Sequence, residues 1–131
     1  MTSSSHPIQS GEDVVRVRQI VRTATVEAGF GLVDQTKFIT AASELARNTL
    51  LHGGGGDMVI ETFDRNGRKG IRLAFCDAGP GIPDVERALQ DGYSTGGGLG
   101  LGLSGARRLS NEFAIESHVG RGTRVTIARW K

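Results

Sequence analysis

The sequence is poor in cysteine and has no long apolar run. Its one cysteine, Cys76, excludes an intramolecular disulfide framework and is typical of a protein from a reducing compartment. No apolar stretch approaches the roughly 18 residues of a membrane span, and residues 1–10 lack the apolar centre of a signal peptide. We therefore expect a cytoplasmic protein that neither crosses nor binds a membrane.

The sequence also lacks a strong excess of charge of either sign. The formal net charge is +2, which is too small to indicate a nucleic-acid-binding face. Two interpretations of the basic C-terminal third stay open: an ordinary solvated face, or a surface that helps to hold a triphosphate or an acidic partner. Its basic residues are Arg107, Arg108, Arg121, Arg124, Arg129 and Lys131.

Glycine, by contrast, is abundant. The chain has 20 glycines in 131 residues, with four at 53–56 and six between 96 and 105, so the backbone needs unusual freedom at two places. Hydrophobic residues make up 37% and charged residues 23%, an ordinary globular balance. We expect one folded domain over residues 13–131, preceded by a flexible tail at 1–12.

Hydrophobic spacing predicts helices at 14–28 and 34–52, a short helical stretch at 85–89 and a third long helix from residue 103. Strands are predicted at 58–63 and 69–77, joined by the turn-forming pair Asn66 and Gly67, and again at 113–118 and 123–130. This order predicts an α/β fold, a two-layer sandwich with a mixed sheet covered on one face by helices. The uncovered face could serve as a docking surface.

Two sets of polar residues are candidates for chemistry. Glu44, Asn48 and His52 recur every four residues, so they form one stripe along the second helix. Carboxylate and amide oxygens suit Mg²⁺, although Glu and Asn at this spacing are more often simply solvated. Asp77 ends an apolar strand, where its carboxylate could accept a hydrogen bond from an exocyclic amine or could close an Asx-type turn.

Two further segments could complete a nucleotide site. The glycines between 96 and 102 run directly into the third predicted helix, where free backbone N–H groups favour a phosphate, although a flexible loop is the plainer interpretation. Thr123 opens the last strand and could place a hydroxyl at the floor of the same pocket, or be an ordinary strand threonine.

In combination, these four elements resemble the N, G1, G2 and G3 boxes of the GHKL ATPase and kinase superfamily, whose nucleotide-binding domain is the Bergerat fold. Within it the chain is similar to the anti-sigma-factor serine/threonine kinases, and above all to the RsbT-like switch kinases of the stressosome. The motifs that carry the resemblance are ELARN at 44–48, DAGPGIPD at 77–84, DGYST at 91–95, GGLGLGL at 97–103 and NEF at 111–113.

The resemblance implies a role for each matching position. Asn48 would be a Mg²⁺ ligand, and Glu44 would orient or activate the attacking hydroxyl. Asp77 would read the adenine amine of ATP, and Thr123 would support the adenine end. Glycines would line the rest of the nucleotide, Gly79 and Gly81 at the base and Gly98, Gly100 and Gly102 along the phosphates. Residues 84–97 would correspond to the ATP lid.

The resemblance also implies partners that the residues alone would not have revealed. The substrate would be a serine or threonine of a STAS-domain protein, and a PP2C-type phosphatase or a sigma factor would be a further partner. Two other functions stay open: an anti-sigma factor that sequesters a sigma factor directly, and a non-catalytic adaptor that binds ATP. A histidine-kinase fragment is disfavoured, because no helix pair carrying a phosphoacceptor histidine precedes the domain.

Overall fold

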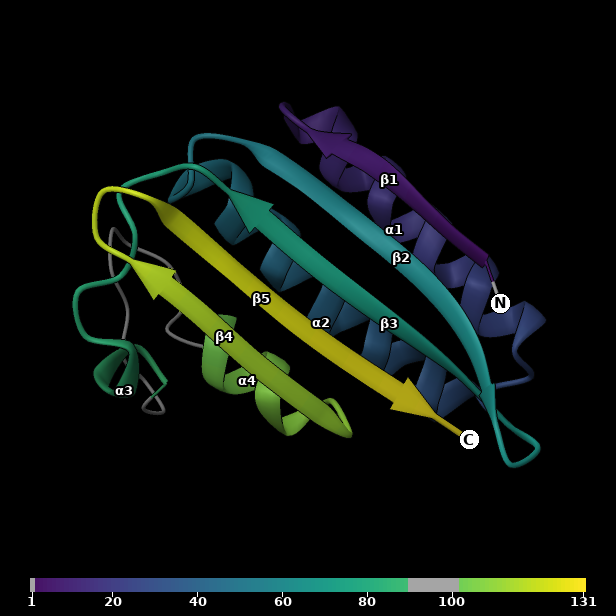
Figure 1. Cartoon of the computed structure of the whole chain (residues 1–131). Helices are drawn as coiled ribbons and strands as arrows, with labels where there is room; N and C mark the ends of the chain where they lie inside the picture. The colour runs from purple at the N-terminus through teal and green to yellow at the C-terminus, as the bar shows by residue number, and fades with distance from the viewer. Residues whose placement is uncertain (1, 90–101) are drawn as a thin grey trace.

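In the part of the chain that the structure describes, five strands form one antiparallel sheet in the order β1-β2-β3-β5-β4 (Figure 1). The computed structural model describes residues 2–89 and 102–131. The strands are β1 (Thr2–Ile8), β2 (Gly56–Arg65), β3 (Arg68–Asp77), β4 (Glu112–His118) and β5 (Gly122–Trp130). The sequence predicted a mixed sheet, but every pair of strands in the described chain is antiparallel, because hairpins join β2 to β3 and β4 to β5.

Helices cover one face of the sheet, which confirms the predicted two-layer sandwich (Figure 1). The helices are α1 (Gly11–Glu27), α2 (Leu32–Leu51), α3 (Val85–Ala88) and α4 (Gly102–Arg108). In the figure α1, α2 and α4 lie behind the sheet and α3 lies at its side. Within the described ranges, none of these helices is long and apolar enough to cross a membrane.

The predicted helix at 14–28 corresponds to α1, and its apolar spacing is what buries it. Val17, Val21 and Ala24 are buried on one side of the helix, as a period of 3.6 residues requires. Ser10 begins the helix, because its hydroxyl accepts a hydrogen bond from the backbone N–H of Asp13 at 3.3 Å. The face so formed packs on α2 and the N-terminal edge of the sheet.

Cross-strand pairing builds the other half of the core. Asn66 and Gly67 both have positive φ, 56° and 82°, as a two-residue type I′ hairpin requires, and they set the register between β2 and β3. In this register Met58 pairs with Phe75, which also pairs with Val125 of β5. All three side chains are buried beneath the helices.

Residues 2–8 differ from expectation, because they form β1 rather than a flexible tail. Thr2 pairs with Thr62 and Ile8 pairs with Gly56, so the segment is an edge strand along β2. Its polar residues gave no alternation of apolar side chains, and Ile8 is the one position in it that is fully buried. An edge strand forms backbone hydrogen bonds to a neighbouring strand on one side only, and it needs to bury little apolar area. For this reason the hydrophobic pattern did not predict a strand here.

Two helix boundaries also differ from the predictions. The second helix was expected from Asp34, but α2 begins two residues earlier, at Leu32, and the carboxylate of Asp34 instead pairs with Arg129 at 2.7 Å. The third helix was expected to be long, yet α4 spans seven residues and ends at Arg108. The short α4 follows directly on a segment that lies outside the described residues.

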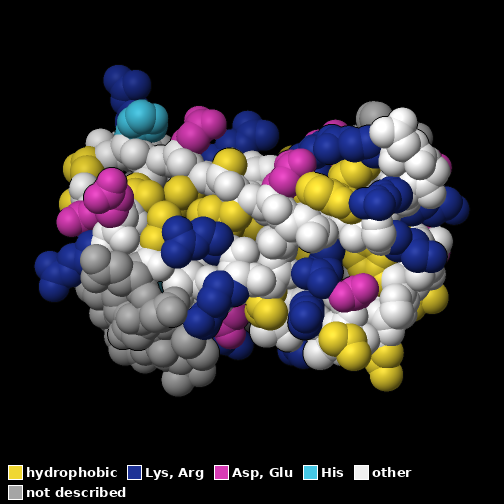
Figure 2. All heavy atoms as spheres, turned by 90° about the horizontal axis from the view of Figure 1, so that it is seen from below, with side chains coloured by type: hydrophobic (Ala, Val, Ile, Leu, Met, Phe, Trp, Pro, Cys, Tyr) yellow, Lys and Arg dark blue, Asp and Glu magenta, His cyan; other side chains and the backbone are white. Residues whose placement is uncertain are grey.

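The basic C-terminal third divides into solvated and structural residues. Arg129 is largely buried, and it donates to the Leu109 carbonyl at 2.8 Å as well as pairing with Asp34. The rest are exposed, namely Arg107, Arg108, Arg121, Arg124 and Lys131. Figure 2 looks at the molecule from below Figure 1, and Lys and Arg side chains there are interspersed with apolar and acidic ones. Both interpretations of these exposed residues stay predictions.

Candidate functional site

Asp77 lies where β3 ends, on the helix-facing side of the sheet. One carboxylate oxygen, Oδ1, accepts hydrogen bonds from the backbone N–H of Gly79 at 2.9 Å and of Thr123 at 3.2 Å. Among the described residues nothing donates to the other oxygen, Oδ2. The Asx-type turn foreseen for Asp77 is therefore present, and it still leaves one acceptor oxygen for a ligand.

The predicted pair of Asp77 and Thr123 is brought together by strand register. These residues are direct partners in the β3–β5 ladder, so they meet although 46 residues separate them. The Thr123 hydroxyl lies 2.7 Å from the Ser117 hydroxyl, which in turn accepts the backbone N–H of Ile82 at 2.7 Å. The network fastens the loop after Asp77 to the β4–β5 hairpin.

Sequence reasoning missed Ser117. The alternation of Phe113, Ile115 and Ser117 along β4 places all three on one face, and Ser117 pairs with Thr123 in the ladder. That alternation was a usable signal, because a polar residue in the apolar phase of a strand either lies at a site or needs an internal partner.

The two predicted base-lining glycines are packed tightly against backbone. A β-carbon at Gly79 would lie 2.7 Å from the carbonyl oxygen of Gly53. Gly81 has φ +79°, and a β-carbon there would overlap the carbonyl oxygen of His118. The structure therefore gives both positions a packing reason to be glycine, and contact with a base stays a prediction.

Gly53 was not predicted as a site residue, yet it borders Asp77. A β-carbon at Gly53 would lie 2.6 Å from Oδ2 of Asp77, the oxygen that nothing else contacts by a hydrogen bond in the described chain. The N–H of Gly53 donates to the carbonyl oxygen of Asn48 at 3.2 Å. The glycine run is thus the link through which the end of α2 reaches the end of β3.

The polar stripe on α2 reaches the same end of the sheet. Glu44 and Asn48 are both half-buried, one helical turn apart. Glu44 pairs with Arg47 at 3.3 Å. His52 is exposed, and its backbone N–H caps the helix by donating to the Asn48 carbonyl at 2.9 Å. His52 is thus the C-cap residue of α2 through its backbone.

Of the three glycines predicted to line the phosphates, the structure describes one, Gly102. Gly98 and Gly100 lie outside the described residues, as does most of the predicted lid. Gly102 is the first residue of α4, so the run does lead into a helix as expected. The neighbouring strand positions Asp77, Thr123 and Ser117 lie within the described residues.

The donor set fits a nucleotide with a single metal ligand from the protein. The Asp77 carboxylate keeps one oxygen for an amine, and the backbone of Gly53 and Gly79 packs closely beside it. No three His, Cys, Asp or Glu side chains gather as a metal cage within residues 2–89 and 102–131. Asn48 offers an amide oxygen, which suits Mg²⁺ completed by phosphate oxygens and water.

A separate concavity of about 380 Å³ lies between α1 and the β1–β2 edge. Its lining includes Arg16, Ile20 and Glu27 from α1 and Ile60 and Thr62 from β2. None of the residues predicted for the nucleotide site lines it. This concavity and the residues predicted for the nucleotide site therefore lie in different parts of the described chain.

Comparison with known families assigns the class of protein. The family of histidine kinase-, DNA gyrase B- and HSP90-like ATPases matches residues 33–131. The chain belongs to this ATP-binding family, the one that the sequence resemblance indicated as GHKL. The two-layer sandwich and the polar end of β3 are thus the fold and the candidate site of a GHKL ATPase domain.

Particular relatives narrow the class. The chain is 47% identical to the serine/threonine-protein kinase RsbT of Bacillus subtilis over 118 residues. This match covers 90% of this chain and 89% of that protein. It is 31% identical over 101 residues to an anti-sigma F factor of Geobacillus stearothermophilus, covering 72% of this chain and 68% of the relative.

A solved structure shares the fold. The RsbU and RsbW domains of Rv1364c from Mycobacterium tuberculosis align over the whole of this chain with a TM-score of 0.66 and 18% identity. The chain spans about one third of that longer protein, 33% of its length. At this identity the likeness concerns the fold alone, and it agrees with the helix-covered sheet described above.

Proposed function

We propose that the chain is an ATP-dependent serine/threonine protein kinase that phosphorylates a STAS-domain antagonist or scaffold protein in a partner-switching pathway. The observation that carries this proposal is the 47% identity, over 90% of the chain, to a relative named as a serine/threonine-protein kinase. Family membership supplies the nucleotide, since the matched family consists of ATPases. The acceptor hydroxyl then comes from the partner protein.

Asp77 is proposed to read the adenine amine, with Gly79 and Gly81 beside the base and Thr123 supporting it. The geometry supports this assignment in one respect above all. Oδ1 of Asp77 is fixed by two backbone N–H groups while Oδ2 is left as an acceptor, so the carboxylate is already oriented before any ligand arrives. Such preorganisation lowers the entropic cost of binding, because the carboxylate need not be ordered when the ligand arrives.

Asn48 and Glu44 are proposed to serve the phosphate end, Asn48 as the Mg²⁺ ligand and Glu44 as the group that orients or activates the attacking hydroxyl. Bound Mg²⁺ would neutralise the phosphate charge, which is most of what phosphoryl transfer needs from a site. The pair of Glu44 with Arg47 is partly exposed, 25% and 50% for the two side chains, and therefore weak. The Glu44 carboxylate can exchange that partner for a substrate hydroxyl.

Backbone N–H groups are proposed to follow the phosphates at Gly98, Gly100 and Gly102. The support is the sequence motif together with the start of α4 at Gly102. Glycine at these positions leaves the N–H groups unobstructed by side chains.

The direct test of the proposal is phosphoryl transfer. The purified chain is incubated with Mg²⁺, labelled ATP and candidate STAS-domain proteins, and any acid-stable phosphate is mapped to a residue. Stable label on a serine or threonine of one STAS protein is expected. Label on the kinase alone, or acid-labile label on a partner histidine, would contradict the proposed acceptor.

Glu44 separates a kinase from a non-catalytic ATP-binding adaptor. We expect Glu44→Ala to abolish transfer while ATP still binds, because Glu44 lies one turn from the metal ligand and not beside Asp77. Arg47→Ala is the matched control, since it removes the same ion pair but keeps the carboxylate. If both variants lose activity equally, the ion pair and not the carboxylate matters; if Glu44→Ala stays active, the catalytic assignment is wrong.

The similarity to anti-sigma F factors favours a second candidate, a chain that sequesters a sigma factor directly. A stable, nucleotide-dependent complex with a purified sigma factor would support it over the switch-kinase proposal. A PP2C-type phosphatase is the further partner that the switch-kinase proposal includes, and a rise in its phosphatase rate on adding this chain is the expected result.

A further inference from the structure

The glycine run at residues 53–56 connects α2 to β2 and is held from two sides. On one side, a β-carbon at Gly53 would lie 2.6 Å from Oδ2 of Asp77. On the other side, a β-carbon at Gly55 would lie 2.6 Å from Oε1 of Gln9. The Nε2 of Gln9 also donates to the carbonyl oxygen of Gly56 at 3.3 Å. The run therefore lies between the end of β3 that carries Asp77 and the corner that joins β1 to α1.

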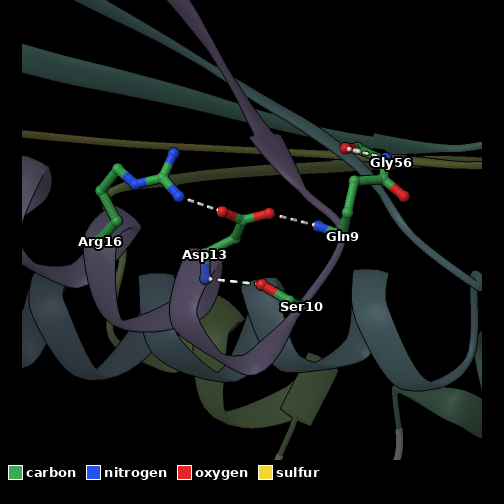
Figure 3. Close-up of polar contacts among 5 residues, drawn as sticks. All are labelled: Gln9, Ser10, Asp13, Arg16 and Gly56. Carbon is green, nitrogen blue, oxygen red and sulfur yellow. Dashed lines mark hydrogen bonds and ion pairs between the residues drawn. The ribbon is translucent and has the colours of Figure 1, made fainter.

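The backbone of Gln9 is anchored, while its side chain is exposed. Its backbone N–H donates to Oδ2 of Asp13 at 2.8 Å, and the other oxygen of that carboxylate pairs with Arg16 (Figure 3). Asp13 is only 8% exposed, and the Ser10 hydroxyl accepts its backbone N–H. Figure 3 shows the side chain of Gln9 extending from this corner toward the Gly56 backbone. The anchor of Gln9 is thus a nearly buried carboxylate with donors on both of its oxygens.

A run of four glycines needs such a brace. Glycine loses more conformational freedom on folding than any other residue, and Gly54 and Gly55 also adopt positive φ, +74° and +108°. Side chains of the run itself cannot hold it in place, because it has none. Its described contacts are the N–H of Gly53 on the Asn48 carbonyl at 3.2 Å, the N–H of Gly55 on the Thr49 carbonyl at 3.0 Å, the pairing of Gly56 with Asp77 and Ile8, and the side chain of Gln9.

We propose that Gln9 is a positioning residue for the nucleotide site, holding the glycine run so that Gly53 stays against Asp77. This rests on the proposed function, because it assumes that Asp77 reads the base. Without the brace, the arrangement that binds nucleotide would be a smaller fraction of the population. The apparent dissociation constant rises in inverse proportion to that fraction.

The test compares Gln9→Ala and Gln9→Glu with the wild type. Both variants remove the donor to the Gly56 carbonyl, and the second keeps the length of the side chain. Loss of one neutral hydrogen bond predicts binding of ATP about 3- to 10-fold weaker by calorimetry. Adenosine without phosphates should weaken by the same factor, because the run touches the residue assigned to the base. Gln19→Ala, an exposed glutamine of α1 away from the run, is the matched control.

Hydrogen exchange in the absence of nucleotide separates positioning from a general loss of stability. In Gln9→Ala, exchange should accelerate at the N–H groups of Gly53 and Gly55, while core amides of β3 keep their wild-type rates. Unchanged exchange in the run, or nucleotide affinity equal to that of Gln19→Ala, overturns the proposal. Faster exchange throughout the sheet also overturns it, because Gln9 would then be merely structural.

The same experiments distinguish failure of this inference from failure of the proposed function. A wild-type chain that binds neither ATP nor adenosine refutes the assignment of Asp77 and, with it, the positioning role. A wild type that binds both, beside Gln9 variants that bind equally well, leaves the kinase proposal standing and refutes the brace alone.

Discussion

Replacing Asp77 by asparagine tests the adenine assignment most sharply, because the two side chains have the same shape. In the structure Oδ1 accepts the N–H groups of Gly79 and Thr123, and the amide oxygen of asparagine can accept both. What changes is the second position, where an NH₂ donor replaces the carboxylate oxygen that faces Gly53. We therefore expect Asp77→Asn to fold, with a free energy of unfolding within about 1 kcal/mol of the wild type.

Nucleotide binding should respond far more than stability. A hydrogen bond to a charged group contributes about 1.5 to 3 kcal/mol, so its loss weakens ATP binding by about 10- to 150-fold. The purine amine is the postulated donor, and inosine triphosphate carries a carbonyl oxygen in its place. Wild type should prefer ATP, and Asp77→Asn should lose that preference.

Calorimetric titration of both proteins with both nucleotides measures the effect, beside thermal unfolding of each. Asp64→Asn is the control, because Asp64 is exposed at the β2–β3 turn and also accepts a backbone N–H, that of Gly67 at 3.0 Å. An intact Asp77→Asn that binds ATP within about twofold of wild type refutes the reasoning. An equal loss for ATP and inosine triphosphate would show that Asp77 acts on something other than the amine.

Two further predictions follow from the site and its surroundings. Thr123→Val removes the hydroxyl shared with Ser117 but keeps the N–H that Asp77 accepts, so urea unfolding should show a loss of about 1 kcal/mol; unchanged stability would mean that this hydroxyl pair is dispensable. Burial raises the pKa of the Cys76 thiol, Arg124 opposes the shift, and Asp57 and Asp77 add to it. Iodoacetamide should therefore alkylate native Cys76 more slowly than the unfolded chain at neutral pH. The unfolded chain releases the thiol proton first, so stability should fall as the pH rises above about 8.5. In Cys76→Ser that decline should be smaller, and an equal decline would assign it to other groups.

The parts of the fold that sequence could predict are those where local pattern and burial agree. The apolar spacing of Val17, Val21 and Ala24 marked α1, and Asn66 with Gly67 marked the hairpin. β1 was not predicted from the sequence, because this strand is held by backbone pairing with β2 and by burial of Ile8 rather than by an alternation of apolar side chains. Pairing of this kind depends on a distant strand, and a window of neighbouring residues does not contain it.

The residues of the candidate site also divide into those that the sequence predicted and those that it did not. Asp77 and Thr123 were each predicted from a position at a strand end, as parts of one pocket, and the β3–β5 ladder makes them direct partners. Ser117 and Gly53 were not predicted as site residues, and neither was the contact of Gln9 with Gly56, since each of these contacts joins residues far apart in the chain. The assignments of Gly98 and Gly100 stay predictions, because both lie outside the described residues.

The strand order has a consequence for synthesis of the protein. Although β5 comes last of the five strands, it lies inside the sheet, between β3 and β4. A growing polypeptide on the ribosome therefore exposes the side of β3 until residues 122–130 have emerged and docked. Retention of adenosine by tethered nascent chains of increasing length should appear only after that point, which would make nucleotide capture a reporter of the docking of β5.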